Sequence, residues 1–477
     1  MKKAGLIFLS ALFCMSSFIA GCSLAPEYKR PDSPVSDSWP KGEAYKGIES
    51  VNAKMPASDI KWKDFLVNDQ LQKVVELSLK NNRDLRVAAL NIEKTRALYQ
   101  IQRSELFPNV KSTASKFTQG LPETLSGVKD DSVTTQYTFN VGISSYELDM
   151  FGRIASLKDK ALEQYLATEQ ARSSAQISLV AEVTAEWLTL AADHERLKLA
   201  KDTLKAQQET YDMIKRRFEV GASSELDLRQ VQTRVEAAKI DIARYTGKVA
   251  QDENALILLV GSPVPADLMP SELGTIESKS GALKDVKAGL SSDVLLKRPD
   301  ILSAENQLKA ANANIGAARA AFFPKISITG TYGVASGQLS DLFSSSQAWT
   351  FSPQISVPIF DGGLNQANLE AAEADQKIAV AKYEKTIQTA FREVADALAQ
   401  RGTVDDQMKA QKSFLEATSE SYRLSDARYK SGIDSYLNVL DAQRSLYSAQ
   451  QSMIDVRLQK LSNMVTLYKV LGGGAVD

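Results

Sequence analysis

Cys22 is the residue whose type and position most directly predict a chemical modification. The segment before it, residues 1–21, carries two lysines, a short apolar run and small residues that end in Ile19-Ala20-Gly21. This order is typical of a secretory signal peptide, which is removed from the mature protein. Because Ile-Ala-Gly-Cys has the pattern of a bacterial lipobox, we expect cleavage before Cys22 and a covalent lipid there. Diacylglyceryl would modify the thiol, and an N-acyl group the new amino terminus.

The residue after the predicted modification, Ser23, indicates the destination of the lipid. By the lipoprotein sorting rule, serine rather than aspartate at this position favours the outer membrane. Cys14 lies in the removed segment, so the mature chain would hold one thiol and no disulfide. The alternative is an ordinary signal peptide followed by an incidental cysteine.

Other residue types that could support chemistry are scattered. His194 is the only histidine, lies among charged residues and has no second histidine or thiol near it in the sequence. The methionines form no soft-metal ladder, and no Gly-rich phosphate loop, nucleophile elbow or metal-ligand spacing occurs. The formal net charge of −1 argues against a protein that binds nucleic acid by phosphate neutralisation. We therefore expect no enzyme, no catalytic residues, no metal site, no nucleic-acid partner and no cofactor besides the lipid.

The chain contains an internal duplication. Residues of the same type recur in order, with an almost constant offset between the two copies. The first copy carries Asp84, Arg103, Phe107, Pro108, Glu182, Val183, Arg217, Gly221, Ser224, Leu226 and Gly261, which recur as Asp300, Arg319, Phe323, Pro324, Glu393, Val394, Arg428, Gly432, Ser435, Leu437 and Gly472. The repeat predicts the domain organisation. The predicted parts are a signal peptide (1–21), a lipidated extended leader (22–65), a first repeat (66–261), a linker (262–292), a second repeat (293–474) and a tail (475–477).

Each copy is expected to contain one helix, a pair of strands and then two very long helices. Apolar and polar residues alternate in stretches such as 137–143 and 349–359, which indicates strands with one apolar face. The stretch after Pro108 alternates only weakly. Strands of about ten residues with this pattern are those that a transmembrane barrel uses.

Apolar residues seven apart predict long coiled-coil helices. One such series is Leu190, Leu197, Leu204, Tyr211 and Phe218. No proline interrupts residues 152–218, so at about 1.5 Å per residue this helix could span roughly 100 Å. Gly221 and Gly432 would end the long helices, and Ser224 and Ser435 are candidate N-caps of the helices that return.

Four strands per chain cannot close a barrel, and open strand edges are not tolerated in lipid. The chain must therefore form an oligomer, and three copies would supply twelve strands. The predicted fold class is an α+β membrane protein. It is a trimeric 12-stranded β-barrel, with four strands per chain, continuous with a long α-helical coiled-coil barrel.

The motifs of the chain resemble those of the TolC family of outer membrane factors. They include residues 148–153 (Leu-Asp-Met-Phe-Gly-Arg), 161–169, 311–324 and 436–444, with Phe-Pro before each strand pair. The resemblance covers essentially the whole chain and is strongest to the lipoprotein (NodT) branch, typified by OprM and CusC. It implies a passive homotrimeric exit duct of a tripartite efflux pump. A periplasmic adaptor (membrane fusion protein) and an inner-membrane RND transporter would be its partners, beside outer membrane lipid.

In that family the helical tips close the periplasmic end like an iris. By resemblance, Leu437 and Asp441 match the constriction rings, and Arg444 lies one turn further on. Asp227 and Tyr429 match partners in the closing contacts, whereas Asn438 stands where TolC has an aspartate. The alternative is that Asp227 and Asp441 are solvated charges near helix starts, where carboxylates are favoured.

The hairpin tips also predict a docking site for the adaptor. Its candidate residues are Arg217, Gly221 and Ser224 in the first copy, and Arg428, Gly432 and Ser435 in the second. Glycine permits close backbone approach, and the arginines and serines offer hydrogen bonds. Helix capping alone would explain the same glycines and serines, and the two interpretations are compatible.

Two other functions remain open on the sequence. The duct could belong to a copper or silver cation efflux system, as the resemblance to CusC permits. In another class, the chain could be a structural trimeric coiled-coil lipoprotein without a pore. The alternating strand pattern counts against that second possibility.

Overall fold

The computed structural model describes residues 23–46, 59–122, 124, 132–279, 283–286, 291–344 and 347–474. The predicted signal peptide, its lipid site Cys22 and the tail 475–477 lie outside the described residues. The chain divides into two compact units. The first comprises Met1–Asp32, Asn91–Glu169 and Ser303–Tyr383, and the second comprises Ser33–Leu90, Gln170–Leu302 and Glu384–Asp477.

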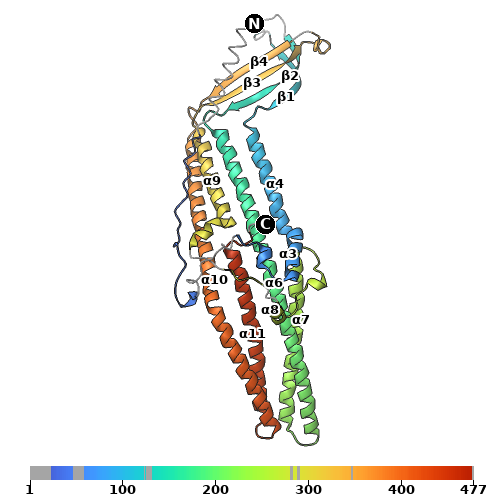
Figure 1. Cartoon of the computed structure of the whole chain (residues 1–477). Helices are drawn as coiled ribbons and strands as arrows, with labels where there is room; N and C mark the ends of the chain where they lie inside the picture. The colour runs from blue at the N-terminus through green and yellow to red at the C-terminus, as the bar shows by residue number, and fades with distance from the viewer. Residues whose placement is uncertain are drawn as a thin grey trace. The chain divides into compact units, whose positions relative to one another are not determined.

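The first unit contains one antiparallel sheet of four strands. These are β1 (Val110–Leu121), β2 (Ser132–Leu148), β3 (Lys325–Ser336) and β4 (Gln347–Ser356), in the order β1-β2-β3-β4 (Figure 1). Each copy of the repeat therefore contributes one strand pair, and β2 joins β3 where the two pairs meet. The expected four strands per chain are confirmed.

The sheet has one apolar and one polar face. On the apolar face Ile326 pairs with Ile355 and Tyr332 with Trp349, while on the polar face the Thr331 and Thr350 hydroxyls lie 2.6 Å apart. Strand β1, whose apolar and polar residues alternate only weakly, carries polar side chains on the apolar face of the sheet. Its residues opposite the apolar residues of β2 include Ser112 and Lys116, and the Lys116 ammonium lies over the Tyr137 ring, 5.6 Å from its centroid. The apolar side chains at this edge therefore come mostly from β2.

A β-bulge in β2, which the sequence did not predict, keeps the apolar residues on both sides of the bulge on the same face of the sheet. The register to β3 shifts between Ile143 and Tyr146, and Ser145 adopts a left-handed φ of 55°. The Ser145 N–H donates to Thr329 Oγ1 at 3.1 Å. The bulge adds one extra residue to β2 between these positions. Tyr146, an even-numbered residue, therefore points to the same apolar face as the odd-numbered Ile143, and it lies opposite Ile328.

The helices of the two copies correspond, as the duplication predicts. In the first copy α4 (Arg83–Ser104) precedes the strands, and α6 (Arg153–Glu219) and α7 (Glu225–Val260) follow them. In the second copy the equivalents are α9 (Pro299–Ala320), α10 (Leu364–Lys430) and α11 (Tyr436–Val470). The two longest helices, α6 and α10, have 67 residues each. None of the described helices is long and apolar enough to cross a membrane.

The second unit has a helical core that includes part of the predicted linker. Trp187 of α6 is fully buried, and its indole Nε1–H donates to the Leu268 carbonyl at 3.1 Å. Leu273 and Ile276, in or at the start of the short helix α8 (Leu273–Lys279), are also buried. This part of the linker is therefore packed against the unit. Helix α3 (Asp69–Asn81) packs nearby against α7. The remaining short elements are η1 (Glu43–Tyr45), α2 (Trp62–Phe65), η3 (Ala266–Leu268) and η4 (Ser292–Lys297), with η5 (Leu339–Asp341) in the first unit.

The second unit also contains an unusual group of carboxylates. Asp193 of α6 is 3 % exposed and bonded to Arg196, which also bonds Asp455 of α11. Across from it on α7, the Asp252 Oδ2 atom is buried without a hydrogen-bond partner among the described residues. Burial, and then the neighbouring carboxylates Asp193 and Glu186, raise the pKa of Asp252 to about 7.

This shifted pKa predicts a pH-dependent stability. Because the folded-state pKa of Asp252 lies above its ordinary value of 3.8, folding favours the protonated form. The stabilisation is full below the ordinary value and is lost as the pH rises towards about 7. We expect Asp252→Asn to raise the Tm at about pH 8. Between about pH 5 and about pH 8, the Tm of the variant should fall less than that of the wild type. Circular dichroism in detergent measures both.

The matched control is Asp202→Asn, which removes an exposed carboxylate from α6. Its Tm should follow that of the wild type at every pH. A curve for Asp252→Asn that runs parallel to the wild-type curve would contradict the assigned protonation.

Candidate gate at the helical tips

Two glycines build the turns at the tips of the long hairpins. Gly221, between α6 and α7, has φ 76°, and Gly432, between α10 and α11, has φ 73°. The Gly221 N–H donates to Phe218 O at 2.9 Å, and the Gly432 N–H donates to Tyr429 O at 2.9 Å. This left-handed conformation is nearly free of strain only for glycine. Both turns lie at the same end of the four helices (Figure 1).

The two return helices start differently. Ser224 forms a complete capping box, because its Oγ accepts from the Asp227 N–H at 3.1 Å and Asp227 Oδ2 accepts from the Ser224 N–H at 3.2 Å. The hydrogen bonds from Ser224 lower the pKa of Asp227. Ser435 also occupies an N-cap position, but its side chain makes no capping hydrogen bond. The expected serine cap is therefore confirmed in full only in the first copy, and Asp227 has a structural task there.

Arg217 and Tyr429 connect the two hairpins. Arg217, at the end of α6, donates from Nη1 to the Tyr429 hydroxyl near the end of α10, at 3.0 Å. Its guanidinium also lies 5.6 Å from the centroid of the Tyr429 ring, within cation–π range. The Tyr429 ring in turn packs against that of Tyr436, with 5.0 Å between centroids. Arg217, assigned from the sequence to docking, thus contacts a residue assigned to the gate.

An apolar cluster lies next to this contact. Its buried members come from α6, α7 and α11, and the half-buried Tyr211, Tyr422 and Tyr429 pack around it. The buried members are Ile214, Leu228, Val231, Tyr436, Val439 and Leu440. Full burial of such a side chain contributes about 1.5–3 kcal/mol. The cluster therefore holds the two hairpins together close to their tips.

Asp434, which the sequence reasoning missed, organises the second tip. It accepts two hydrogen bonds from Arg428, to Oδ2 at 2.6 Å and to Oδ1 at 3.2 Å. This bidentate contact to Arg428 is the main cause of the lowered pKa of Asp434. Arg428, predicted to offer hydrogen bonds to an adaptor, is thus engaged within its own turn. The available signal was an acidic residue two positions after the turn glycine.

The remaining gate candidates lie on an exposed face of α11. Leu437 is 52 % exposed, and Asp441 forms an ion pair with Arg444 at 3.2 Å. Their spacing of four and three residues puts the three side chains on one face. Within one chain, the described contacts of Asp441 and Arg444 do not include Arg217 or Tyr429. Asn438 contributes a hydrogen bond that helps to lower the pKa of Asp434.

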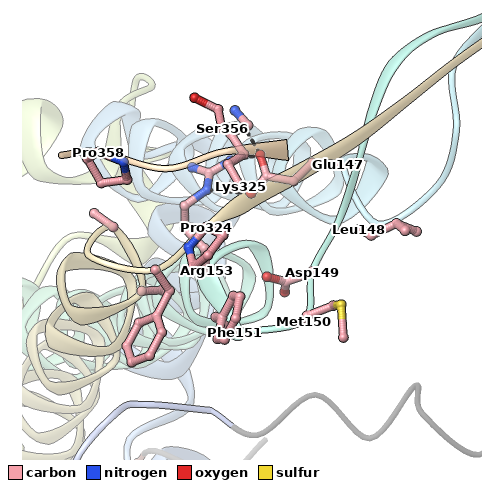
Figure 2. Close-up of a pocket in the computed structure, with 13 residues that line it drawn as sticks. Glu147, Leu148, Asp149, Met150, Phe151, Arg153, Pro324, Lys325, Ser356 and Pro358 are labelled. Atoms are coloured by element: carbon pink, nitrogen blue, oxygen red, sulfur yellow. Dashed lines mark hydrogen bonds and ion pairs between the residues drawn. The ribbon is translucent and has the colours of Figure 1, made fainter. Parts of the chain in front are cut away.

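A pocket of about 320 Å³ lies in the first unit, where strands and helices meet (Figure 2). Glu147 accepts from Arg153 at 2.8 Å through both oxygens, and from the Lys325 ammonium at 2.8 Å. Asp149 Oδ2 accepts from the Ala155 N–H at 2.7 Å and so caps the start of α6. The Phe151 and Phe323 rings stack with their centroids 4.7 Å apart. These contacts fix the ends of β2 and β3 to α6, which explains the motif at residues 148–153.

Comparison with known proteins identifies the family. A sequence model described as "Outer membrane efflux protein" matches residues 74–262 and 290–473. The chain belongs to the outer membrane efflux protein family. The predicted family is thereby confirmed.

Similar proteins are outer membrane components of efflux pumps. The antibiotic efflux pump outer membrane protein ArpC of Pseudomonas putida is 48% identical over 467 residues, covering 98% of this chain and 95% of that protein. The toluene efflux pump outer membrane protein TtgC, also of Pseudomonas putida, gives the same identity and coverage. OprJ of Pseudomonas aeruginosa is 42% identical over 457 residues, covering 96% of this chain and 94% of that protein.

Solved structures of membrane proteins have the same fold. A membrane protein from Pseudomonas aeruginosa has a TM-score of 0.88 at 42% identity, covering 95% of this chain and 98% of that one. CusC has a TM-score of 0.84 at 38% identity, with coverages of 95% and 100%. The open state of the Neisseria gonorrhoeae channel MtrE has a TM-score of 0.85 at 37% identity, with coverages of 95% and 99%.

These similarities establish the class of the protein. This outer membrane efflux protein is the outer membrane channel component of a multi-protein efflux pump, with a periplasmic helical extension. Because such channels are passive ducts, it is not an enzyme. The predicted fold, function class and location are thereby confirmed.

Proposed function

We propose that three copies of this outer membrane efflux protein form the passive exit duct of a tripartite drug efflux pump of the RND type. The observation that carries this proposal is the four-stranded sheet, in which the outer strands β1 and β4 each pair on only one side within the described part of the chain. In lipid such edges must be paired, and three sheets joined edge to edge give twelve strands. The apolar face would meet lipid, and the face rich in hydroxyl groups would line the lumen.

The helical tips supply the gate and the docking site in this proposal. The bond between Arg217 and Tyr429 and the exposed residues Leu437 and Asp441 lie beside the two tip turns. Three copies of Asp441 around one axis would repel one another and attract cations. A periplasmic adaptor that touches the turns could therefore open the duct by small helix movements. The inner-membrane transporter would then load it.

The proposed substrates are amphipathic drugs and organic solvents. Support comes from the names of the relatives, which include an antibiotic pump and a toluene pump at 48% identity. A copper or silver system is the alternative that the similarity to CusC, at 38% identity, permits. We further propose that Cys22 is acylated and anchors the mature chain to the outer membrane. The alternative of a structural lipoprotein without a pore conflicts with membership of an efflux channel family.

The susceptibility of a strain that lacks this protein tests the proposed substrates. Deletion should lower the inhibitory concentrations of several unrelated antibiotics, dyes and detergents severalfold, since pump and adaptor would have no exit. The inhibitory concentrations of copper and silver salts are measured for comparison. As the control, the gene supplied in trans should restore the wild-type values. Sensitivity confined to the metal salts would move the assignment to cation export.

A further inference from the structure

The apolar face of the sheet has a defined height. Leu148 and Ile326 form the pair on this face that is nearest the helices, and the pair of Tyr137 and Ser336 lies ten residues further along β3. At about 3.4 Å per residue and a tilt of about 40° from the membrane normal, these two rows are about 26 Å apart in height. The apolar band of an outer membrane protein is about 25 Å tall. The row of Tyr137 and Ser336 therefore lies at one boundary of this band.

This boundary faces the outside of the cell. Strand β3 begins at Lys325, five residues after α9 ends at Ala320, so Ser336 lies at the end of the strand away from the helices (Figure 1). The helical extension is periplasmic. The row of Ser336 is therefore at the level where the lipid headgroups of the outer leaflet begin.

A lysine stands on the apolar face at this boundary. Lys116 of β1 lies opposite Tyr137, and two residues further on, Thr118 lies opposite Thr135 with their hydroxyls 3.3 Å apart. Among the described residues, the Lys116 ammonium contacts the Tyr137 ring and pairs with no carboxylate. A cation on the lipid side of a strand is costly at the membrane midplane and nearly free of cost near the headgroups. Lys116 therefore presents a positive charge, next to an aromatic ring, at headgroup level.

The loop between β3 and β4 turns back onto the same face. Phe343, seven residues past the end of β3, packs its ring against that of Phe139, with 5.9 Å between centroids and 60° between ring planes. Because Phe139 pairs with Val334, this contact lies inside the boundary of the band. Phe343 is 76% exposed and Leu339 63%, whereas Leu342 between them is buried. Two apolar side chains of the loop are therefore available to lipid chains.

We propose that Lys116, Tyr137 and the loop of residues 337–344 form a binding site for a phosphate-bearing lipid of the outer leaflet. Its acyl chains would cover Phe139 and Phe343, and its phosphate would meet the Lys116 ammonium. The lysine selects an anionic headgroup, because basic residues are attracted to anionic lipid at the membrane surface. The site would fix the height of the sheet in the membrane. It rests on the proposed orientation, in which the apolar face meets lipid.

Binding of a defined lipid tests the headgroup contact. Bisphosphorylated lipid A is titrated onto the full-length protein in a neutral detergent, and bound lipid is counted by native mass spectrometry. Lys116→Gln should weaken binding about fivefold, whereas Lys116→Arg should retain it. Lys111→Gln is the matched control and should bind like the wild type, because Lys111 lies on the polar face of the same strand, opposite Gly142. Equal affinity of Lys116→Gln and the wild type would overturn the site.

Two further ligands show what the site recognises. Lipid A without its phosphates should bind the wild type about fivefold more weakly, and Lys116→Gln should not weaken it further. Inorganic phosphate in large excess should leave the bound lipid in place, since it lacks the acyl chains that Phe139 and Phe343 contact. Displacement by inorganic phosphate would mean a simple anion site and would refute a site for lipid.

A depth measurement tests the loop. A fluorophore is attached at Phe343→Cys or at Gln338→Cys, and the wild type treated in the same way corrects for labelling of other thiols. In vesicles of phosphatidylcholine and lipid A that contain a nitroxide on the acyl chain, the label at position 343 should be quenched more strongly than the label at position 338. Equal quenching would contradict insertion of the loop. Single-channel conductance of the same samples reports the duct separately, so failure of the lipid site is distinguishable from failure of the proposed function.

Discussion

Replacing Arg217 and Tyr429 by alanine and phenylalanine is expected to raise the single-channel conductance of this channel severalfold. The two side chains share the hydrogen bond and the cation–π contact that connect the end of α6 to the end of α10. At an exposed site the pair contributes about 1 kcal/mol, which is a factor of about 5 in an equilibrium between closed and open tips. The measurement is the current through the purified protein in planar bilayers.

Two further variants show whether the effect belongs to the gate. Arg229→Ala removes an exposed arginine from α7 whose partners among the described residues, Glu225 and Gln232, lie on its own helix, and it should leave the current unchanged. Asp441→Ala should raise the current, because it removes a carboxylate that would appear three times around the proposed duct axis. A wild-type current in the Arg217 and Tyr429 variant would remove this contact from the gate, and the same result for Asp441→Ala would remove that residue.

Substituting Gly142 or Gly333 by alanine is expected to abolish assembly in the outer membrane. Both glycines lie where β2 meets β3, so the two copies of the repeat join there. A Cβ at Gly142 would lie 2.2 Å from the Gly330 oxygen, and one at Gly333 would lie 2.1 Å from the Phe139 oxygen. These atoms belong to paired backbone and cannot move without loss of strand pairing. Overpacking of this kind costs about 1–3 kcal/mol per site, or more where backbone must move.

The readout is the amount of heat-modifiable oligomer in the outer membrane fraction. Gly120→Ala is the matched control, because a Cβ at this glycine of β1 would meet no atom within 4 Å. We expect normal assembly for Gly120→Ala and monomeric, proteolysed chain for the other two variants. Normal assembly of Gly142→Ala would mean that the junction of β2 and β3 adapts more than its geometry suggests.

Periodic features were predictable from the sequence. The heptads predicted the long helices, and the alternation at residues 349–359 predicted a strand with one apolar face, which is β4. The glycines at 221 and 432 gave the two tips. Such features depend on local spacing along one helix or strand, and a single sequence contains that spacing. The duplication strengthened these predictions, because each element occurs twice.

Contacts between distant segments were not predictable in the same way. The bulge at Ser145 changes the register by one residue without any change in apolar composition. The bond of Arg217 to Tyr429, which are 212 residues apart, depends on which of several nearby partners a long arginine side chain reaches.

The leader (residues 24–30) shows what the sequence predicts and what only the structure reveals. Its sequence shows no period, so it predicts an extended chain without a fixed path. Glu305, Asn312 and Gly316 lie on one face of α9 by their spacing alone, but only the three-dimensional structure shows that the leader follows this face. The repeat, the helices and strands, and the family follow from residue types and their local spacing. The register of β2, the contacts at the tips and the path of the leader follow from packing in three dimensions, because they depend on side chains that meet across long stretches of the chain.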